Sequence, residues 1–267
     1  MFSNNVYEEF FSVNHELQNL ISSIHGLGGL ESNKRTRVAT AFLAKAAKTH
    51  HAIILLCRHG YGEDAEILAR SLFDMVVDLL YMMRFKRDTM FDRYELWDYV
   101  EREKMLNSHG KTRHMRKLLK ERESSPQKGD ESYSDIFKQA RIARKRFKYG
   151  SSSWRPYNLR KMAEKVRHTH TYDTMFKMLS QVAHTAPRII NNYVKIVDGN
   201  LIYTSEQSQK NVADALISGF WLTATILKQF TSLTNTVDMA KITELETRNS
   251  QNVALMLSPW DESSKSE

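Results

Sequence analysis

The chain has 267 residues, of which 41% are hydrophobic and 26% charged, with four prolines and ten glycines. This composition is typical of a soluble globular protein, and the length is sufficient to bury a full core. The single cysteine, Cys57, excludes a disulfide framework and a cysteine zinc site, and no apolar run is long enough to span a membrane. Because the first residues also lack the pattern of a secretory signal, we expect a cytoplasmic protein.

The spacing of apolar residues predicts helices through the first third of the chain. A helix at 4–25 ends at a cluster of glycines, and an alanine-rich helix at 34–58 follows. The turn His59-Gly-Tyr-Gly then leads into a helix at 63–87, which we expect to run antiparallel to the second. This third helix is apolar over more than half of its circumference, so we place it at the centre of the fold.

The rest of the chain is also predicted to be helical. Helices are expected at about 88–109, 111–122, 135–148, 158–166, 172–184, 206–233 and 236–254. Asp198-Gly199 is typical of a tight turn, which predicts one small β-hairpin near 195–205.

The predicted fold is therefore an all-α bundle in which helix 63–87 packs between helices 34–58 and 206–233. We expect one helical domain at 1–255 with a basic middle section at 111–167, and a polar tail at 256–267.

Positive charge is concentrated in the basic middle section. It holds 18 lysines and arginines against six acidic residues, a balance of +12 in a chain whose total is +8. Phosphate backbones bind such clusters through counterion release, and aromatic side chains can stack on unpaired bases. The candidate substrate-binding residues here are Arg141, Arg144, Lys145, Lys148, Trp154, Arg155 and Arg160. Two other interpretations stay open: a solvated face whose aromatic residues anchor the loop to the core, and a surface for an acidic protein.

A polar stripe runs along the predicted central helix. Glu66, Arg70 and Asp74 follow one another at four-residue spacing, and Asp78 extends the row. If exposed, each such pair would stabilise the helix by only about 0.2–0.5 kcal/mol. If buried, the acidic residues would hold Arg70 rigidly and present it to a phosphate. We interpret Glu66, Asp74 and Asp78 mainly as a structural ion network around Arg70.

Histidines supply catalytic candidates rather than a metal site. The chain lacks the Glu-x-x-His motif of di-metal helical bundles, so we predict no metal and no cofactor. Arg102 and His109 match the loose spacing used by metal-independent ribonucleases of the HEPN class. In that chemistry the histidine acts on the ribose 2′-OH or the leaving oxygen, and the arginine stabilises charge on the phosphorane. His184 is the second catalytic candidate, with capping of a helix end as the alternative. Ser180, one helical turn earlier, is a further candidate substrate-binding residue.

Two segments carry a resemblance to a known family. They are HGYGEDAEILARSLFDMVVDLLY in the central helix and YDTMFKMLSQVAH about a hundred residues later. They resemble the helical bacterial proteins catalogued as domain of unknown function 5677, over about residues 40–200. Asp74 replaces the usual glutamate of that family, and Phe176 replaces a second tyrosine. The matching positions are Arg70, Ser71, Asp74, Tyr172, Ser180 and His184.

The resemblance implies a helical fold, a bacterial or phage origin and the proximity of Arg70 to His184. The helical architecture also looks similar to that of HEPN-type and abortive-infection proteins, which is an analogy of fold and not of activity.

Three functional hypotheses follow. The first is a protein of toxin or phage-defence type directed at nucleic acid, RNA rather than DNA. As an enzyme it would be a metal-independent ribonuclease that uses His184 with Arg70, or His109 with Arg102. The second is a non-catalytic adaptor or regulator that binds nucleic acid or an acidic partner protein. The third is a small-molecule sensor whose polar stripe lines an internal pocket. A homodimer or a partner protein fits all three, and no membrane partner is expected.

Overall fold

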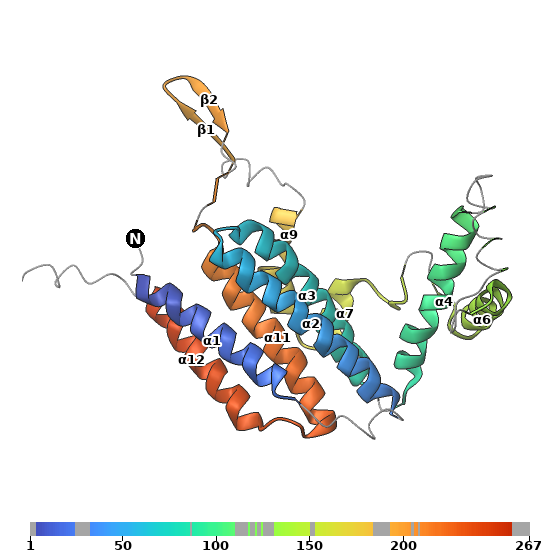
Figure 1. The fold of residues 1–267 in the computed structure, drawn as a ribbon. Coiled ribbons are helices and arrows are strands. Elements are labelled where there is room, and N and C mark those ends of the chain that lie inside the picture. The colour runs from blue at the N-terminus through green and yellow to red at the C-terminus, as the bar shows by residue number, and fades with distance from the viewer. Residues whose placement is uncertain are drawn as a thin grey trace, which may run out of the picture. The chain divides into compact units, whose positions relative to one another are not determined.

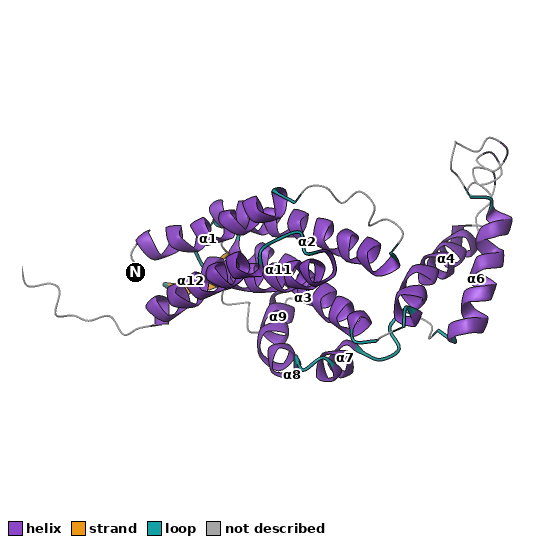
Figure 2. Cartoon of the chain, turned by 90° about the horizontal axis from the view of Figure 1, so that it is seen from below, coloured by secondary structure: helices purple, strands orange, loops and turns teal. Residues whose placement is uncertain are grey.

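The computed structural model describes residues 4–24, 33–85, 87–109, 117, 121, 124, 131–149, 153–183, 193–203, 206–207 and 209–257 (Figure 1). Side chains are described for these residues except 4–6, 109 and 195. Within this part of the chain, helices account for all regular structure apart from one two-stranded antiparallel sheet (Figure 2). The predicted all-α class and the small hairpin are confirmed.

The chain divides into two compact units. The first, the bundle unit, comprises 1–81 and 162–267, and the second, the middle unit, comprises 82–161. The middle unit is built on α4 (Thr89–His109) and α6 (Tyr133–Phe147), which pack against each other. The elements that belong mainly to the bundle unit are α1 (Asn4–Ser22), α2 (Lys34–Arg58), α3 (Gly62–Met83), α7 (Leu159–Lys165), α8 (Thr169–Thr171), η1 (Tyr172–Phe176), α9 (Lys177–Ala183), β1 (Val194–Val197), β2 (Asn200–Tyr203), α11 (Val212–Thr234) and α12 (Met239–Leu257).

The bundle forms around α11 and α2. Helix α11 is apolar on nearly every side and packs most closely on α2, while α1 and α12 also contact it. Gly219 permits this close approach, because a Cβ there would lie 3.3 Å from the side chain of Ile53. Helix α3 corresponds to the predicted helix at 63–87 and ends four residues earlier. Its exposed positions are Asp64, Ile67 and Ser71, so the predicted polar stripe does not face the solvent.

A buried histidine joins α1 to α2. The His50 ring is fully buried, and its Nδ1 accepts from the amide of Gln18 at 2.8 Å. Its Nε2 therefore carries the proton and donates to Asn14 Oδ1 at 2.6 Å. Burial lowers the pKa of His50 to about 3. The ring is thus neutral near pH 7, with both nitrogens hydrogen-bonded, and its role is structural.

The hairpin turn follows from its two central residues. Asp198 and Gly199 have φ angles of 51° and 76°, and two positive values in succession are characteristic of a type I′ turn. The strands pair so that Val197 lies opposite Asn200 and Val194 opposite Tyr203. The turn chemistry recognised in the sequence therefore set the register of the whole hairpin.

A buried arginine organises the middle unit. Arg93 of α4 is 7% exposed and donates to the backbone carbonyls of Trp154 and Phe147, each at 2.6 Å. The Tyr149 hydroxyl donates to the carbonyl of Arg93 at 2.7 Å, and its ring centroid lies 4.6 Å from the guanidinium carbon. Carbonyl dipoles and aromatic faces thus surround the buried charge, and they fix the chain that follows α6 against α4.

None of the helices in the described ranges combines the length and the apolar character that crossing a membrane requires.

Gly62 is expected to be essential for the start of α3. A Cβ at this position would lie 2.2 Å from the carbonyl oxygen of Lys210 and 2.6 Å from the amide nitrogen of Val212, both backbone atoms at the start of α11. Because neither can move without shifting that helix, Gly62→Ala should lower the free energy of unfolding by about 1–3 kcal/mol in urea denaturation. Gly199→Ala is the control, since nothing lies within 4 Å of its Cβ and only the hairpin turn is strained. An unchanged free energy of unfolding in Gly62→Ala would contradict this account.

Candidate functional site

Arg70 of α3 and Ser180 of α9 meet in the bundle unit. The Arg70 Nε donates to Ser180 Oγ at 3.0 Å, although the two residues are 110 positions apart in the sequence. The guanidinium carbon also lies 5.0 Å from the centre of the Phe176 ring. Both side chains are half-buried. Two of the sequence-predicted site residues are thus brought together, whereas His184 lies outside the described residues.

A short π-helix positions this contact. The element η1 precedes α9, and its rings Tyr172 and Phe176 stack with centroids 4.6 Å apart and an interplanar angle of 20°. Phe73 of α3 lies 5.2 Å from the Phe176 ring and 6.2 Å from the Tyr172 ring. Such π-helical turns occur frequently at functional sites. The three rings hold η1 and α9 against α3, and so determine where Ser180 meets Arg70.

The ion network predicted around Arg70 is not formed. Within the described part of the chain, Arg70 makes no ion pair, neither with Glu66 nor with Asp74. The reason is direction: Arg70 reaches toward α9, whereas the Glu66 carboxylate accepts from the Asn211 amide at 2.6 Å, beside the start of α11. Asp74 and Asp78 have interactions of their own. The polar row of α3 is therefore not one ion network, and its buried or half-buried side chains make separate contacts.

Glu66 is the most perturbed carboxyl in this region. It is 1% exposed, and burial raises its pKa to about 7. Nearby Asp214 and Glu63 add to this rise, and the hydrogen bond from Asn211 opposes it. Burial together with Glu66 also raises the pKa of the Cys57 thiol to about 12. Cys57 is therefore an unreactive core thiol.

The second catalytic candidate, Arg102, is neutralised by acidic neighbours. Its guanidinium pairs with Glu131 at 2.6 Å and with Asp98 at 3.5 Å. The Tyr99 hydroxyl donates to the same Glu131 at 2.9 Å. Arg102 would have to give up Glu131 before it could stabilise charge on a phosphorane. The side chain of its predicted partner, His109, lies outside the described residues.

The exposed face of α6 carries a row of unpaired cations, which we call the basic stripe. Lys138, Arg141 and Lys145 follow one another on this face at three- and four-residue spacing, and Lys148, the left-handed C-terminal cap of α6, follows them. All four are exposed to solvent and have no ion pair within the described part of the chain. Two flanking arginines differ from them, because Arg144 pairs with Glu103 at 2.7 Å and Arg146 with Asp92 at 2.6 Å. Among the described residues, the cations of α6 thus fall into two groups, those without an ion pair and those neutralised by a carboxylate.

Trp154 does not offer a surface for stacking, which corrects the prediction that it contacts a substrate. It is 6% exposed, and its ring meets Tyr94 edge-on with centroids 5.2 Å apart. Trp154 and the residues that contact Arg93 therefore anchor this loop to the core of the middle unit. This is the role that the alternative interpretation of the basic section gave to its aromatic residues. Arg155 is half-buried and Arg160 exposed, and each has interactions of its own.

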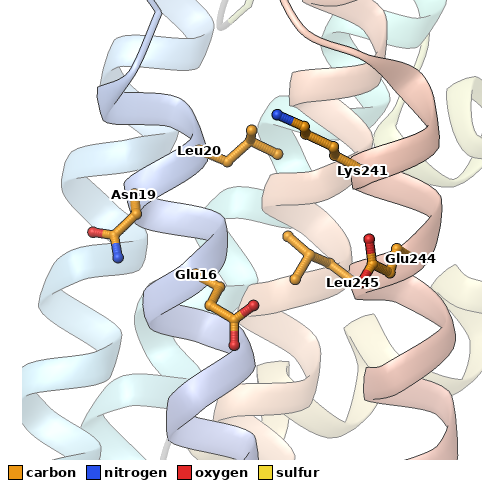
Figure 3. A pocket seen from close by; sticks show the side chains of 6 residues that line it. All are labelled: Glu16, Asn19, Leu20, Lys241, Glu244 and Leu245. Carbon is orange, nitrogen blue, oxygen red and sulfur yellow. The ribbon is translucent and has the colours of Figure 1, made fainter.

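Two surface pockets lie away from the predicted site residues. One, of about 300 Å³, lies between α1 and α12 and is lined by Glu16, Asn19, Leu20, Lys241, Glu244 and Leu245 (Figure 3). The hydrogen bond from Arg248, at 2.6 Å, lowers the pKa of Glu16 in its wall. The other, of about 330 Å³, is lined by Arg58, His59, Gly60, Gln207 and Gln209. No group of three metal-binding side chains converges anywhere in the described ranges.

The sequence model of a family of unknown function, DUF5677, matches residues 36–201, more than half of the chain. The chain belongs to this family. The DUF5677 match runs from α2 to β2, so it includes Arg70, Ser180 and the basic stripe. No curated protein and no solved structure is similar enough to count as a match. Nothing in these comparisons links the chain to HEPN-type or abortive-infection proteins.

Two residues of these sites were not singled out in the sequence. Lys138 precedes Arg141 by three positions, so the spacing that linked the other cations already contained its signal. Asn211 has no comparable signal, because its contact with Glu66 joins residues 145 positions apart. Only the fold shows that this buried carboxyl has an amide partner.

Glu66→Gln is expected to stabilise the protein above neutral pH. The folded-state pKa of Glu66, about 7, exceeds its ordinary value of 4.5. The stability that the protonated side chain contributes to the folded state is therefore complete below pH 4.5 and is lost as pH rises to about 7. Above pH 7 the variant should therefore be more stable than the wild type by up to about 3 kcal/mol, with little difference near pH 4. Denaturant unfolding at both pH values measures this, with the less buried Glu63→Gln as control. A difference that does not change with pH would show that burial of the Glu66 charge is not its cause.

Proposed function

We propose that this DUF5677 protein binds nucleic acid, single-stranded RNA in particular, through the basic stripe of α6. The observation that carries the proposal is the contrast between the four unpaired cations of the stripe and the neutralised Arg144 and Arg146 beside them. A phage-defence or toxin role is the setting we propose for this binding, and it rests on the resemblance of the helical architecture inferred from the sequence.

Electrostatics favours a polyanion as the ligand of the stripe. Like charges four residues apart on a helix, such as Arg141 and Lys145, destabilise it when nothing compensates them. The phosphates of a nucleic acid would remove this repulsion and release counterions. From Lys138 to Lys145 the stripe spans about 10 Å along α6, enough to contact successive phosphates of one strand.

The apolar residues beside the stripe favour unpaired RNA. Phe137 is 38% exposed and Ile142 is 46% exposed, and both lie on the solvent side of α6. An exposed aromatic ring next to cations suits stacking on an unpaired base, which a regular duplex does not offer. Phe137 thus takes the part that the sequence had assigned to the buried Trp154.

The double variant Arg141→Gln/Lys145→Gln should bind a single-stranded RNA about tenfold or more weakly in fluorescence anisotropy. Removal of two phosphate contacts should also reduce the slope of log affinity against log salt by about 1.4. The matched control is Lys45→Gln/Lys48→Gln on α2, which removes the same charge from two exposed lysines without an ion pair in the described part of the chain. Equal weakening by both pairs would show that only net charge matters and would refute the stripe as the binding surface.

A second candidate function, metal-independent RNA cleavage, is favoured by the contact between Arg70 and Ser180. This contact brings Arg70, which has no carboxylate partner among the described residues, to the helix that carries Ser180. His184 follows Ser180 four positions later in the sequence. In this proposal His184 would act on the 2′-OH and Arg70 on the charge of the phosphorane. The part of His184 rests on the sequence.

Cleavage is tested by incubating the purified protein with total RNA in EDTA. We expect degradation by the wild type, its loss in His184→Ala and its retention in His109→Ala, because Glu131 occupies Arg102. Intact RNA with the wild type, or the same cleavage by both variants, would exclude this catalytic site. RNA binding without cleavage would instead support the hypothesis of a non-catalytic adaptor.

A further inference from the structure

We infer that Arg70 and Ser180 form a binding site for a phosphate group in the bundle unit, separate from the basic stripe. The inference does not rest on RNA binding by α6, because it concerns residues of the other unit. It deepens the proposed cleavage, which also uses Arg70, by assigning a ligand class to Arg70 and Ser180. It rests on four features of the pair: unused hydrogen-bond donors, an uncompensated charge, a rigid aromatic support and a donor geometry suited to a tetrahedral anion.

Arg70 and Ser180 both have donors to spare. A guanidinium carries five N–H groups, and within the described part of the chain Arg70 uses only its Nε–H, on Ser180. The two terminal nitrogens form the edge that binds oxyanions through parallel hydrogen bonds. Ser180 accepts from Arg70, so its own hydroxyl proton is available to the same ligand.

Within the residues that the structure describes, no carboxylate compensates the charge of Arg70. A half-buried guanidinium loses part of its hydration, a cost that proteins usually offset with an acidic partner. The acidic side chains one turn away on α3 do not supply it: Glu66 bonds Asn211, and Asp74 forms no ion pair with Arg70. An anionic ligand would supply the missing charge.

The aromatic cluster holds the guanidinium in place. Phe176 lies under Arg70 and is itself fixed by Tyr172 and Phe73. An arginine supported by a ring and by a hydrogen bond at Nε loses little freedom when a ligand binds to its outer edge. The π-helix therefore preorganises the pair.

The arrangement suits phosphate better than carboxylate. A carboxylate has two oxygens and is saturated by the arginine edge alone. A phosphate has further oxygens, and the Ser180 hydroxyl beside the guanidinium can donate to a third. The class of ligand we assign is therefore a phosphate-bearing molecule.

Inorganic phosphate is the probe, used in isothermal titration calorimetry and thermal unfolding at constant ionic strength. The wild type should bind it saturably, with a rise in the unfolding midpoint. Ser180→Ala should weaken binding at least tenfold, and so should Arg70→Lys, which keeps the charge but loses the fork. If Arg70→Lys fails to fold, Ser180→Ala decides alone, because it only removes a half-buried hydroxyl.

Two control variants distinguish phosphate binding at this pair from binding at a neighbouring hydroxyl or at the basic stripe. Ser71→Ala removes the neighbouring exposed hydroxyl of α3, which bonds the Leu68 carbonyl, and should leave phosphate binding unchanged. Arg141→Gln/Lys145→Gln should also leave it unchanged, so that failure of the stripe and failure of this site are distinguished. No saturable binding by the wild type, equal binding by Ser180→Ala and Ser71→Ala, or equal affinity for acetate would each overturn the assignment.

Discussion

The hydrogen bond from Arg70 to Ser180 is the contact on which the arrangement of the candidate site depends. It joins α3 to α9, and the stacked rings of η1 make it possible by fixing where α9 begins. The rest of the polar row on α3 is arranged accordingly: Arg70 leans away from its acidic neighbours, and Glu66 finds an amide at the start of α11 instead. Burial then keeps that carboxyl half-protonated near pH 7, which limits the negative charge close to Arg70.

Which arginines can meet a ligand depends on what already surrounds them. Arg93 is enclosed by carbonyls and rings, and Arg102 is held by Glu131, so both are committed to the middle unit. Arg144 likewise has an acidic partner from α4, whereas Arg141 on the same helix has none in the described part of the chain. Sequence spacing places Arg141 and Arg144 in one group. Neutralisation of Arg144 by a neighbouring carboxylate distinguishes it from Arg141, and only the fold shows which arginine has such a neighbour.

The sequence was informative wherever the determining interactions are local. Helical periodicity gave the all-α class, and Asp198-Gly199 predicted the hairpin because positive φ angles are a property of those two residues. It was least informative where contacts join distant segments. Trp154 looks like a stacking residue in a basic section, yet Tyr94, sixty positions earlier, buries it. The prediction of an ion network on α3 was wrong for the same reason. Arg70 and Glu66 bond to Ser180 and Asn211, beside α9 and α11, rather than to each other.

The two proposed anion-binding sites, the basic stripe and the Arg70–Ser180 pair, differ in their physical character. The basic stripe is exposed and extended, so it suits the repeating charges of a strand, and binding there should be sensitive to salt. Arg70 is half-buried, rigidly supported and paired with a hydroxyl, so it suits one phosphate held in a fixed orientation. Because the family match spans both features, neither is an addition at the edge of the DUF5677 region.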